Sequence, residues 1–271
     1  MVIKAARAAG KVMRDNWYLP KKINVAEAHD IKLELDVRCQ ALIEKILAAE
    51  YPDIPALGEE GNTGDTTAEF RWVIDPIDGT VNYASGLPHA AVSIALQARG
   101  DRWQTPAKPG PRRADNLVTR HPSHISVVGV IYDPFTDELW STVFGKPTLL
   151  NGRPVQVSSH ARVEDSMIAI GFSKSKDNFE KCLPHFIRIA RRARKVRIMG
   201  SAALELVYVA SGRLEAYVER TINLWDVAAG ALLVENAGGE FHAVPAPNGK
   251  MRMCADNGKL RKKMQLGSML K

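Results

Sequence analysis

The hydrophobic and polar positions of the first half of the chain predict two helices followed by a set of strands. Apolar residues recur at helical spacing from Val2 to Trp17, and Pro20 ends that segment. A second helical pattern runs from about Leu35 to Ala49. Four apolar runs then have the length and composition of strands: Phe70–Ile74, which stops at Asp75-Pro76, Ala90–Leu96, Val127–Tyr132 and Glu138–Phe144.

The second half of the chain alternates between strand and helix patterns. The turn Asn151-Gly152-Arg153-Pro154 marks a boundary between two lobes. The segment Arg99–His124 is rich in Pro, Arg, Gly and Asp and predicts an irregular surface insertion, either a tolerated hairpin tip or a substrate-facing lid. The later pattern predicts strands at Ser166–Gly171 and Glu215–Glu219, and helices at Asn178–Arg194, Ala202–Ser211 and Asp226–Asn236, the last two closed by glycines.

Composition and cysteine content indicate a folded protein with reduced thiols. Of the 271 residues, 45% are hydrophobic, which is typical of globular proteins and argues against wholesale disorder. No apolar run reaches the length of a membrane span, and the N-terminal segment lacks the features of a secretory signal. Cys39, Cys182 and Cys254 are far apart in the sequence, which favours free thiols over a disulfide frame or a zinc site. We therefore expect a cytoplasmic protein that does not associate with membranes.

The formal net charge of +7 makes a polyanionic partner a hypothesis to weigh. Much of the excess lies in Arg112 and Arg113, in the run from Arg188 to Arg197, and in Arg261 to Lys263. Such runs are more typical of a solvated helix face, and no zinc-finger, homeodomain or RNP-type aromatic pattern accompanies them. We therefore do not expect a nucleic-acid-binding protein, while an interface or a substrate-steering role for these residues stays open.

The most specific local pattern is Asp75-Pro76-Ile77-Asp78-Gly79-Thr80, directly after an apolar run. Pro76 fixes one backbone angle and Gly79 allows a conformation that most residues avoid, so the turn can direct both carboxylates to one point. Two carboxylates and the Ile77 carbonyl between them suit a hard divalent cation. The amides of Gly79 and Thr80, if they open the next helix, would offer donors to a phosphate.

Two further acidic patterns become informative in combination with this one. Glu59 and Glu60 lie between glycines shortly before it, and Asp226 lies near the start of a helical pattern in Leu224-Trp225-Asp226-Val227-Ala228-Ala229-Gly230. Alone, the glutamate pair is typical of a surface and the aspartate of a helix cap. Converging carboxylates repel one another, so the arrangement makes physical sense if cations neutralise them. Because the set contains no His or Cys, magnesium or manganese is favoured over zinc.

Together these patterns resemble the three signature motifs of the inositol monophosphatase family, which contains lithium-sensitive, magnesium-dependent phosphatases. The motifs are Gly58-Glu59-Glu60, Trp72 to Thr80 and Trp225 to Gly230, in the family's order and at compatible separations. The similarity continues through Val81-Asn82-Tyr83, Gly86-Leu87-Pro88 and Gly200-Ser201-Ala202-Ala203, so it covers nearly the whole chain outside 99–124. It implies an α/β fold, a layered α-β-α-β-α sandwich in which an α+β lobe (1–155) precedes an α/β lobe (156–271).

The resemblance also implies roles for individual residues. Thr80 would orient the attacking water, with Asp36 and Glu59 as the other catalytic residues and Glu60 in support of them. Glu219 would hold a substrate hydroxyl. The family commonly forms homodimers, which we expect here too. The metal ligands, for two or three Mg²⁺ ions or for Mn²⁺ in their place, would be Glu59, Asp75, Asp78 and Asp226 through side chains and Ile77 through its carbonyl; the substrate contacts would be Asp78, Gly79, Thr80, Gly200, Ser201, Ala202, Glu219 and Asp226.

The segment before Asp36 departs from the family pattern. Family members often carry Lys well before this aspartate, followed by an Asp-x-Val-Thr-like stretch. This sequence has Val25 at the position of that lysine and reads Asp30-Ile31-Lys32-Leu33-Glu34-Leu35-Asp36. The missing threonines put in question the role of Asp36 and the binding of the most weakly held metal. Lys32 is either a substitute for the missing charge or a solvated side chain.

The substrate stays open at this level. Inositol monophosphate is the expected one, while related enzymes act on fructose bisphosphate, NADP, histidinol phosphate or 3′-phosphonucleotides. A non-enzymatic polyanion-binding protein on the same scaffold, and a structural or regulatory protein of lowered activity, are the competing classes. Because all four acidic ligand candidates are present, the sequence predicts magnesium-dependent hydrolysis of a small phosphate monoester by a metal-activated water.

Overall fold

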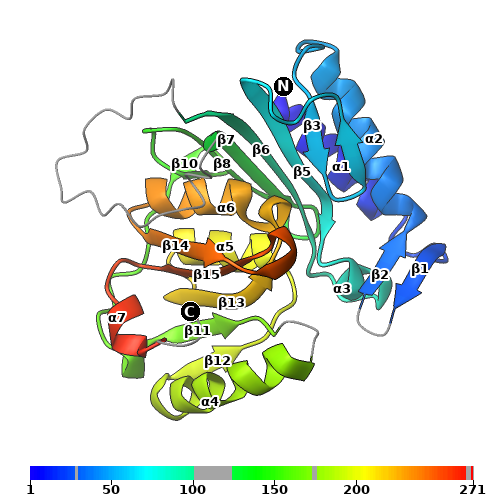
Figure 1. The fold of residues 1–271 in the computed structure, drawn as a ribbon. Helices are drawn as coiled ribbons and strands as arrows, with labels where there is room; N and C mark the ends of the chain where they lie inside the picture. The colour runs from blue at the N-terminus through cyan, green and yellow to red at the C-terminus, as the bar shows by residue number, and fades with distance from the viewer. Residues whose placement is uncertain (28–29, 101–123, 173–175, 267–269, 271) are drawn as a thin grey trace.

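The computed structural model describes residues 1–27, 30–100, 124–172, 176–266 and 270 of the chain. Its helices are α1 (Val2–Asp15), α2 (Glu34–Ala48), α3 (Thr80–Ala84), α4 (Lys176–Arg192), α5 (Ala202–Ala210), α6 (Leu224–Asn236) and α7 (Arg261–Met264), with single 3₁₀ turns at Val163–Asp165 and Pro247–Gly249. Figure 1 shows five layers: α1 with α2, an eight-stranded sheet, α5 with α6, a five-stranded sheet, and α4 with α7. The predicted α-β-α-β-α sandwich is confirmed.

The larger sheet lies between the α1–α2 pair and α6. Its strands, in spatial order, are β10 (Arg153–Pro154), β9 (Leu149–Leu150), β8 (Glu138–Val143), β7 (His124–Asp133), β6 (Ala91–Arg99), β5 (Phe70–Asp78), β3 (Ala56–Gly58) and β4 (Gly61–Thr63). Neighbouring strands are antiparallel except β3 and β5, which are parallel. The central strands β5, β6 and β7 are covered on both faces, which explains why they are nearly continuous apolar runs in the sequence.

The smaller sheet places β12, β11 and β13 parallel to one another. Its strands, in spatial order, are β12 (Lys195–Arg197), β11 (Met167–Ile170), β13 (Ala216–Ile222), β15 (Met251–Asp256) and β14 (Glu240–Pro245). Because the carboxyl ends of parallel strands meet at one edge, Gly171 after β11, the Gly200 turn after β12 and Glu219 on β13 gather at that edge. A separate hairpin of β1 (Ile23–Glu27) and β2 (Asp30–Leu33) leads into α2.

The helices α5 and α6 form a middle layer that belongs to the cores of both sheets. α6 is apolar on all sides, as expected for a helix buried between two sheets. Two glycines allow close approach: a Cβ on Gly129 would lie 2.9 Å from the Ala229 carbonyl oxygen, and one on Gly230 would lie 2.5 Å from Leu206 Cδ1. Ser126 of the larger sheet donates a hydrogen bond to the Ala228 carbonyl at 2.9 Å. The position of α6 along the sheet is therefore fixed tightly.

Part of the basic run 188–197 holds α4 against the chain around α7. Arg188 donates to the Gln265 carbonyl at 3.0 Å, and Arg192 donates to the Lys263 carbonyl at 2.9 Å. Arg194 faces Asp165 at 3.4 Å. These contacts give three of the arginines a structural role, while Arg112 and Arg113 lie outside the described residues.

The predicted helices α1, α2, α4, α5 and α6 are present within two residues of their expected ends, and two boundaries need correction. Strand β5 does not stop at Asp75-Pro76 but continues to Asp78, because a bulge absorbs the proline. Helix α6 begins at Leu224 and not at Asp226, since the Asn223 side chain is available as its cap. The hairpin β1–β2, the strands β14 and β15, and the short strands β3, β4, β9, β10 and β12 were not predicted.

The insertion joins two neighbouring strands, since Arg99 at the end of β6 faces His124 at the start of β7. Residues 101–123, on which its prediction as an irregular loop or lid falls, lie outside the described residues. Among the helices that the structure describes, none has both the length and the apolar character needed to cross a bilayer.

Candidate active site

A bulge at the end of β5 brings Asp75 and Asp78 to the same side of the sheet. Asp75 faces Ser93 and Asp78 faces Ala91 on β6, so two residues of β5 stand opposite a single residue of its neighbour. In a regular strand, residues three apart point to opposite faces, and the extra residue of a bulge reverses that relation. Pro76 fits at this point because the bulge leaves a residue out of the ladder.

Helix α6 supplies a third aspartate from the other side. Asp226 lies in its first turn, where its Oδ2 accepts a hydrogen bond from the Asn223 amide at 2.8 Å. Carboxylate oxygens of Asp75, Asp78 and Asp226 all lie within 4.8 Å of one another. These residues come from two layers of the sandwich, so the cluster depends on the packing of α6 against the larger sheet.

Two more acidic residues surround this trio. The Glu59 amide donates to the Ile74 carbonyl at 3.2 Å, so Glu59 lies beside the residue of β5 that precedes Asp75. Asp36, in the first turn of α2, accepts the Leu33 amide at 2.6 Å with Oδ2. Its Oδ1 is buried and has no hydrogen-bond partner within the described ranges of the chain. Asp36 therefore caps α2 with one carboxylate oxygen and keeps the other, Oδ1, as a buried hydrogen-bond acceptor.

The electrostatics of the cluster indicate a missing positive charge. Burial, followed by repulsion from neighbouring carboxylates, raises the pKa of Asp75 and of Asp226 well above the usual range. Burial likewise raises the pKa of Glu59 and of Asp36 to about 7. For Asp78 the value is about 6, because burial is opposed by hydrogen bonds from Ser201 and the backbone of α5. An all-oxygen set of this kind fits a hard divalent cation, which would neutralise the repulsion.

The turn after β5 meets the start of α5. Gly79 has φ +90° and is the N-cap of α3; a Cβ there would lie 2.9 Å from the His89 carbonyl oxygen and 3.2 Å from that of Gly200. Asp78 Oδ2 accepts both the Ser201 hydroxyl at 2.5 Å and the Ala203 amide at 2.7 Å. The residues Gly200–Ala202 thus lie directly beside the aspartate turn.

Replacement of Gly79 by Ala should disrupt both the turn and the activity. A left-handed conformation costs a non-glycine residue roughly 1–2 kcal/mol, and the contacts with two carbonyl oxygens add to that cost. Gly145 is a matched control, because its φ is +74° and a Cβ there would meet nothing within 4 Å. Thermal unfolding and phosphatase assays should show that Gly145→Ala loses only a few degrees, while Gly79→Ala loses more stability and most of its activity. Equal effects of the two changes would contradict this account.

Thr80 is placed to accept hydrogen bonds. Its hydroxyl donates to the Ile77 carbonyl at 2.9 Å, so its single hydrogen is engaged and its oxygen lone pairs stay free. The Ile77 carbonyl keeps a second lone pair for another partner. Asn82, in α3, donates to the carbonyls of His89 and Met199 at 2.9 and 2.8 Å, and so ties the helix after β5 to the residue before Gly200.

Lys32 pairs with Glu60 beside the cluster, while its side chain stays 39% exposed. Its Nζ lies 3.0 Å from Glu60 Oε1, and its charge opposes the upward shift of pKa at Glu59 and Asp36. The Glu60 amide donates in turn to Gln40 at 2.9 Å. Lys32 therefore supplies positive charge beside Glu59 and Asp36.

Replacement of Lys32 by Met should weaken cation binding without unfolding the protein. Loss of its charge raises the pKa of Glu59 and Asp36 further, so protons compete more effectively with the cation. We expect the Mg²⁺ concentration for half-maximal activity to rise about threefold to tenfold, and the acidic limb of the pH profile to move to higher pH. Lys22→Met is the control, because Lys22 pairs with Glu34 at 2.6 Å in an exposed position. A Mg²⁺ dependence unchanged from that of the control would show that Lys32 does not act on the cluster.

On the far side of the cluster, Glu219 faces the same space from β13. It is nine-tenths buried and accepts a hydrogen bond from the Tyr217 hydroxyl at 3.0 Å. Its charge contributes, after burial and the charges of Asp78 and Glu59, to the raised pKa of Asp226. The predicted residues of the metal side and of the substrate side are therefore gathered in one region.

Sequence reasoning missed Glu205, Tyr217 and Asn82 as members of this region. Glu205 is fully buried on α5 and its Oε1 accepts the Met199 amide at 3.1 Å. Its signal in the sequence is an acidic residue in the otherwise apolar helix Ala202–Ala210. Burying a carboxyl is unfavourable unless it is hydrogen-bonded, so such a residue in a buried helix indicates a specific polar partner.

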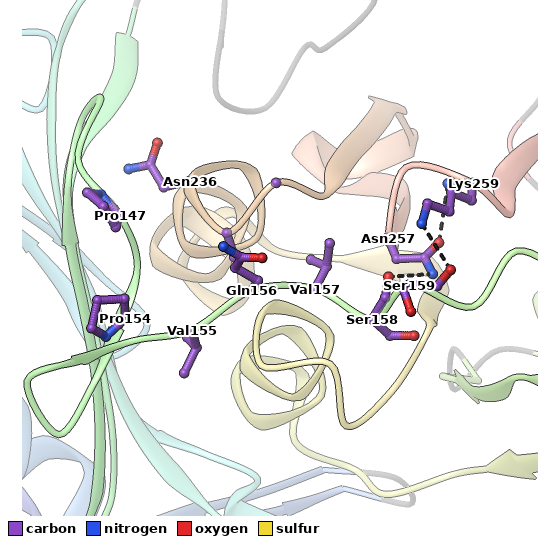
Figure 2. Close-up of a pocket in the computed structure, with 12 residues that line it drawn as sticks. Pro147, Pro154, Val155, Gln156, Val157, Ser158, Ser159, Asn236, Asn257 and Lys259 are labelled. Atoms are coloured by element: carbon purple, nitrogen blue, oxygen red, sulfur yellow. Dashed lines mark hydrogen bonds between the residues drawn. The ribbon is translucent and has the colours of Figure 1, made fainter.

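A hollow of about 560 Å³ lies at the opposite end of α6 from Asp226 (Figure 2). Its lining, drawn from the described residues, contains no carboxylate. Two of the polar side chains that line it are engaged with backbone, since Lys259 donates to the Ser159 carbonyl at 2.9 Å and Asn257 to that of Ser158 at 3.1 Å. The hollow therefore offers none of the carboxylates that gather at the acidic cluster.

Comparison with known proteins agrees with the fold. The model of the inositol monophosphatase family matches residues 1–102 and 120–260. An inositol-1-monophosphatase from Synechocystis is 33% identical over 267 residues, covering 96% of this chain and 85% of that protein. The Nus factor SuhB of Xylella fastidiosa is 36% identical over 253 residues, covering 91% and 83%.

Solved structures give the same result. The extragenic suppressor protein SuhB of Bartonella henselae has a TM-score of 0.83 at 28% identity, covering 99% of this chain and 96% of that one. The inositol monophosphatase of Anabaena has a TM-score of 0.76 at 32% identity, covering 97% and 91%. Fold and site define a metal-dependent phosphatase that hydrolyses phosphate monoesters. The chain belongs to the inositol monophosphatase family.

Proposed function

We propose that the protein is a magnesium-dependent phosphomonoesterase whose substrate is a small polyol phosphate, with inositol monophosphate as the first candidate. The observation that carries the proposal is the meeting of Asp75, Asp78 and Asp226 within 4.8 Å at the junction of β5 and α6. Relatives named inositol monophosphatase support the choice of ester. Mg²⁺ is the first candidate for the cation, with Mn²⁺ as a substitute, because the donors are oxygens only.

The metal ligands in this proposal are Glu59, Asp75, Asp78 and Asp226 through their side chains and Ile77 through its carbonyl. Bound divalent cations would supply charge that polarises the phosphate and makes a nearby water more acidic. The protein's part is to hold four acidic side chains and one carbonyl together around the cation. Asp78 illustrates this, since one of its oxygens holds Ser201 and Ala203 and the other remains for the cluster.

The catalytic roles follow from the hydrogen-bonding capacity that remains. Because the Thr80 hydrogen is donated to Ile77, Thr80 Oγ1 accepts a hydrogen bond from the attacking water. Glu59 accepts the second hydrogen of that water, and the free Oδ1 of Asp36 is the further acceptor on the same side. The amides of Gly79 and Thr80, at the start of α3, donate to the phosphate. Glu219 accepts a hydrogen bond from a hydroxyl of the substrate. Gly200, Ser201 and Ala202 are further contacts of the substrate.

Phosphate release from a panel of esters tests this proposal. The panel contains inositol monophosphate, fructose bisphosphate, NADP, histidinol phosphate and a 3′-phosphonucleotide, each with Mg²⁺, with chelator and with Li⁺ added. We expect turnover that requires Mg²⁺, is highest for inositol monophosphate and is inhibited by Li⁺. Turnover that persists in chelator would refute the metal dependence, and a clear preference for a nucleotide would refute the polyol substrate. Folded protein without activity on any ester would refute the function itself.

We further propose a homodimer in a reducing, cytoplasmic compartment. The proposal of a dimer rests on the homodimers that are common in the family. Light scattering on the purified protein tests it directly. The compartment is supported by Cys39, Cys182 and Cys254, which are all buried and free.

A further inference from the structure

A row of buried hydrogen bonds crosses the larger sheet and ends on the first turn of α6. The Arg71 guanidinium donates to Gln97 Oε1 through Nε at 3.0 Å and through Nη2 at 2.8 Å. Gln97 Nε2 lies 3.3 Å from Ser126 Oγ, which in turn lies 2.9 Å from the Ala228 carbonyl oxygen. The three side chains belong to the neighbouring strands β5, β6 and β7, on which α6 packs (Figure 1). All three are buried, so the row runs through the interior of the protein.

Arg71 sets the direction of every bond in this row. A guanidinium can only donate, so the side-chain oxygen of Gln97 faces Arg71 and its NH₂ group faces Ser126. Ser126 Oγ accepts one of the amide hydrogens, and the single hydrogen of its own hydroxyl is therefore directed to the Ala228 carbonyl. A carbonyl oxygen has two lone pairs, so this bond can exist beside the one that the carbonyl accepts within the helix.

The last acceptor of the row lies two residues from Asp226. Because the helix backbone between them is regular, a carbonyl that is held on the sheet also fixes the start of the Asp226 side chain. A second hydroxyl of the sheet, Ser93 Oγ, lies 3.5 Å from the Trp225 carbonyl oxygen, and Ser93 is the β6 residue that faces Asp75. The sheet that carries two aspartates of the cluster is thus bonded directly to the turn that carries the third.

We propose that Gln97 and Ser126 are positioning residues for the metal ligand Asp226. Neither is a ligand itself; they fix the start of α6 against the strand that ends in Asp75 and Asp78. Mg²⁺ demands a nearly octahedral geometry with ligand distances of about 2.0–2.1 Å, so a shift of one aspartate relative to the other two weakens its binding. This inference rests on the proposed metal-dependent phosphatase function and extends it to residues that lie behind the site.

Thr148 provides a matched control at the other end of α6. Its hydroxyl donates to the Leu233 carbonyl at 2.6 Å, and it is buried like Ser126. Leu233 lies about 10 Å along the helix from Asp226. We would compare Ser126→Ala with Thr148→Val by titration calorimetry of the metal-free protein with Mg²⁺, and by thermal unfolding in chelator.

The two variants should differ in metal binding and not in stability. Each loses one buried hydrogen bond from a hydroxyl to a helix carbonyl, so the thermal midpoints of both should fall by a few degrees. The Mg²⁺ dissociation constant should rise about tenfold in Ser126→Ala, the effect of losing a residue that orients a ligand. In Thr148→Val it should stay within about twofold of the unaltered protein.

A second variant tests the route through Gln97. In Gln97→Glu, the carboxylate keeps both bonds from Arg71 but has no hydrogen to donate, so it takes the hydrogen of Ser126 away from Ala228. The Mg²⁺ dissociation constant should then rise about as far as in Ser126→Ala. In the Ser126→Ala background the same change should add less than about twofold, because the hydroxyl that transmits it is already gone. An effect of the added charge alone would be equal in both backgrounds.

Each other outcome overturns the proposal. A Mg²⁺ dissociation constant that is unchanged in Ser126→Ala, or that Thr148→Val raises as far, would show that the bond only stabilises the fold. An equal effect of Gln97→Glu in both backgrounds would remove Gln97 from the positioning role. Should Gln97→Glu fail to fold, the comparison of Ser126→Ala with Thr148→Val decides.

Failure of the underlying function gives a different result. If the unaltered protein binds Mg²⁺ but hydrolyses no ester, the phosphatase proposal is refuted, while the comparison of dissociation constants still tests the positioning of Asp226. If the unaltered protein does not bind Mg²⁺, both proposals are refuted.

Discussion

Replacement of Asp78 by Asn is expected to lower kcat/KM about a thousandfold or more while the fold survives. Asp78 uses a single oxygen, Oδ2, for its bonds to Ser201 and Ala203. The oxygen of an asparagine can take over both bonds, which turns its NH₂ group toward Asp75 and Asp226 where a ligand oxygen stood. A loss of about 4 kcal/mol of charge stabilisation in the transition state corresponds to that fall in rate.

Kinetics over a range of Mg²⁺ concentrations and thermal unfolding in chelator check this result together. Without metal, Asp78→Asn should be at least as stable as the unaltered protein, because one of the mutually repelling charges is gone. Asp53→Asn is the control, since Asp53 is an exposed aspartate in the turn after α2. Unchanged turnover in Asp78→Asn would show that the acidic cluster is not the metal site.

The metal-free protein should become more stable as the pH is lowered from 8 to about 5. The pKa of Glu59 and of Asp36 is about 7 and that of Asp78 about 6, whereas ordinary carboxyl groups of an unfolded chain titrate near 4. The folded state therefore binds more protons in this interval. The stabilisation by protonation is fully present below about pH 4 and is lost as the pH rises through 6 to 7.

Saturating Mg²⁺ should reverse this trend. At a concentration about 100 times its dissociation constant, a ligand that binds only the folded state adds roughly 2.7 kcal/mol, or about 5–10 °C in the thermal midpoint. The gain should be largest at pH 8 and smallest at pH 5, where protons occupy the ligands. Scanning fluorimetry at four pH values, with Mg²⁺ and with chelator, measures both effects. The Asp78→Asn variant should show a flatter profile in chelator, and identical profiles for the two proteins would contradict the electrostatic account.

The elements with the strongest local sequence patterns were the ones that could be predicted. The strand before Asp75, the helix around Asp226 and the order of the layers follow from apolar patterns and from the family resemblance. The exact end of β5 could not be predicted, because Pro76 usually ends a strand and only the register with β6 shows that a bulge accommodates it. Strands β14 and β15 were not predicted because their sequence mixes polar and apolar residues without a clear strand pattern. Their pairing depends on partners elsewhere in the chain.

Residues whose role depends on a partner far along the chain were harder still. Lys32 was ambiguous in the sequence, and only the approach of β2 to Glu60 separates a solvated lysine from one that faces the cluster. Glu205 had no motif at all, since its partner is the Met199 amide, which lies outside its own helix. The carboxylates of Asp75 and Asp226 could be paired by the resemblance, but not by spacing, because more than half of the chain separates them.

The position of α6 between two sheets has a consequence for how the protein is made. Asp75 and Asp78 leave the ribosome long before Asp226, and the two sets meet only when α6 docks on the larger sheet beside Gly129. A nascent chain therefore presents no complete ion site until most of it has been synthesised. The repulsion among the carboxylates is likewise postponed to this late docking step. Capture of a cation would then coincide with closure of the sandwich, so that metal uptake reports that the chain has folded to completion.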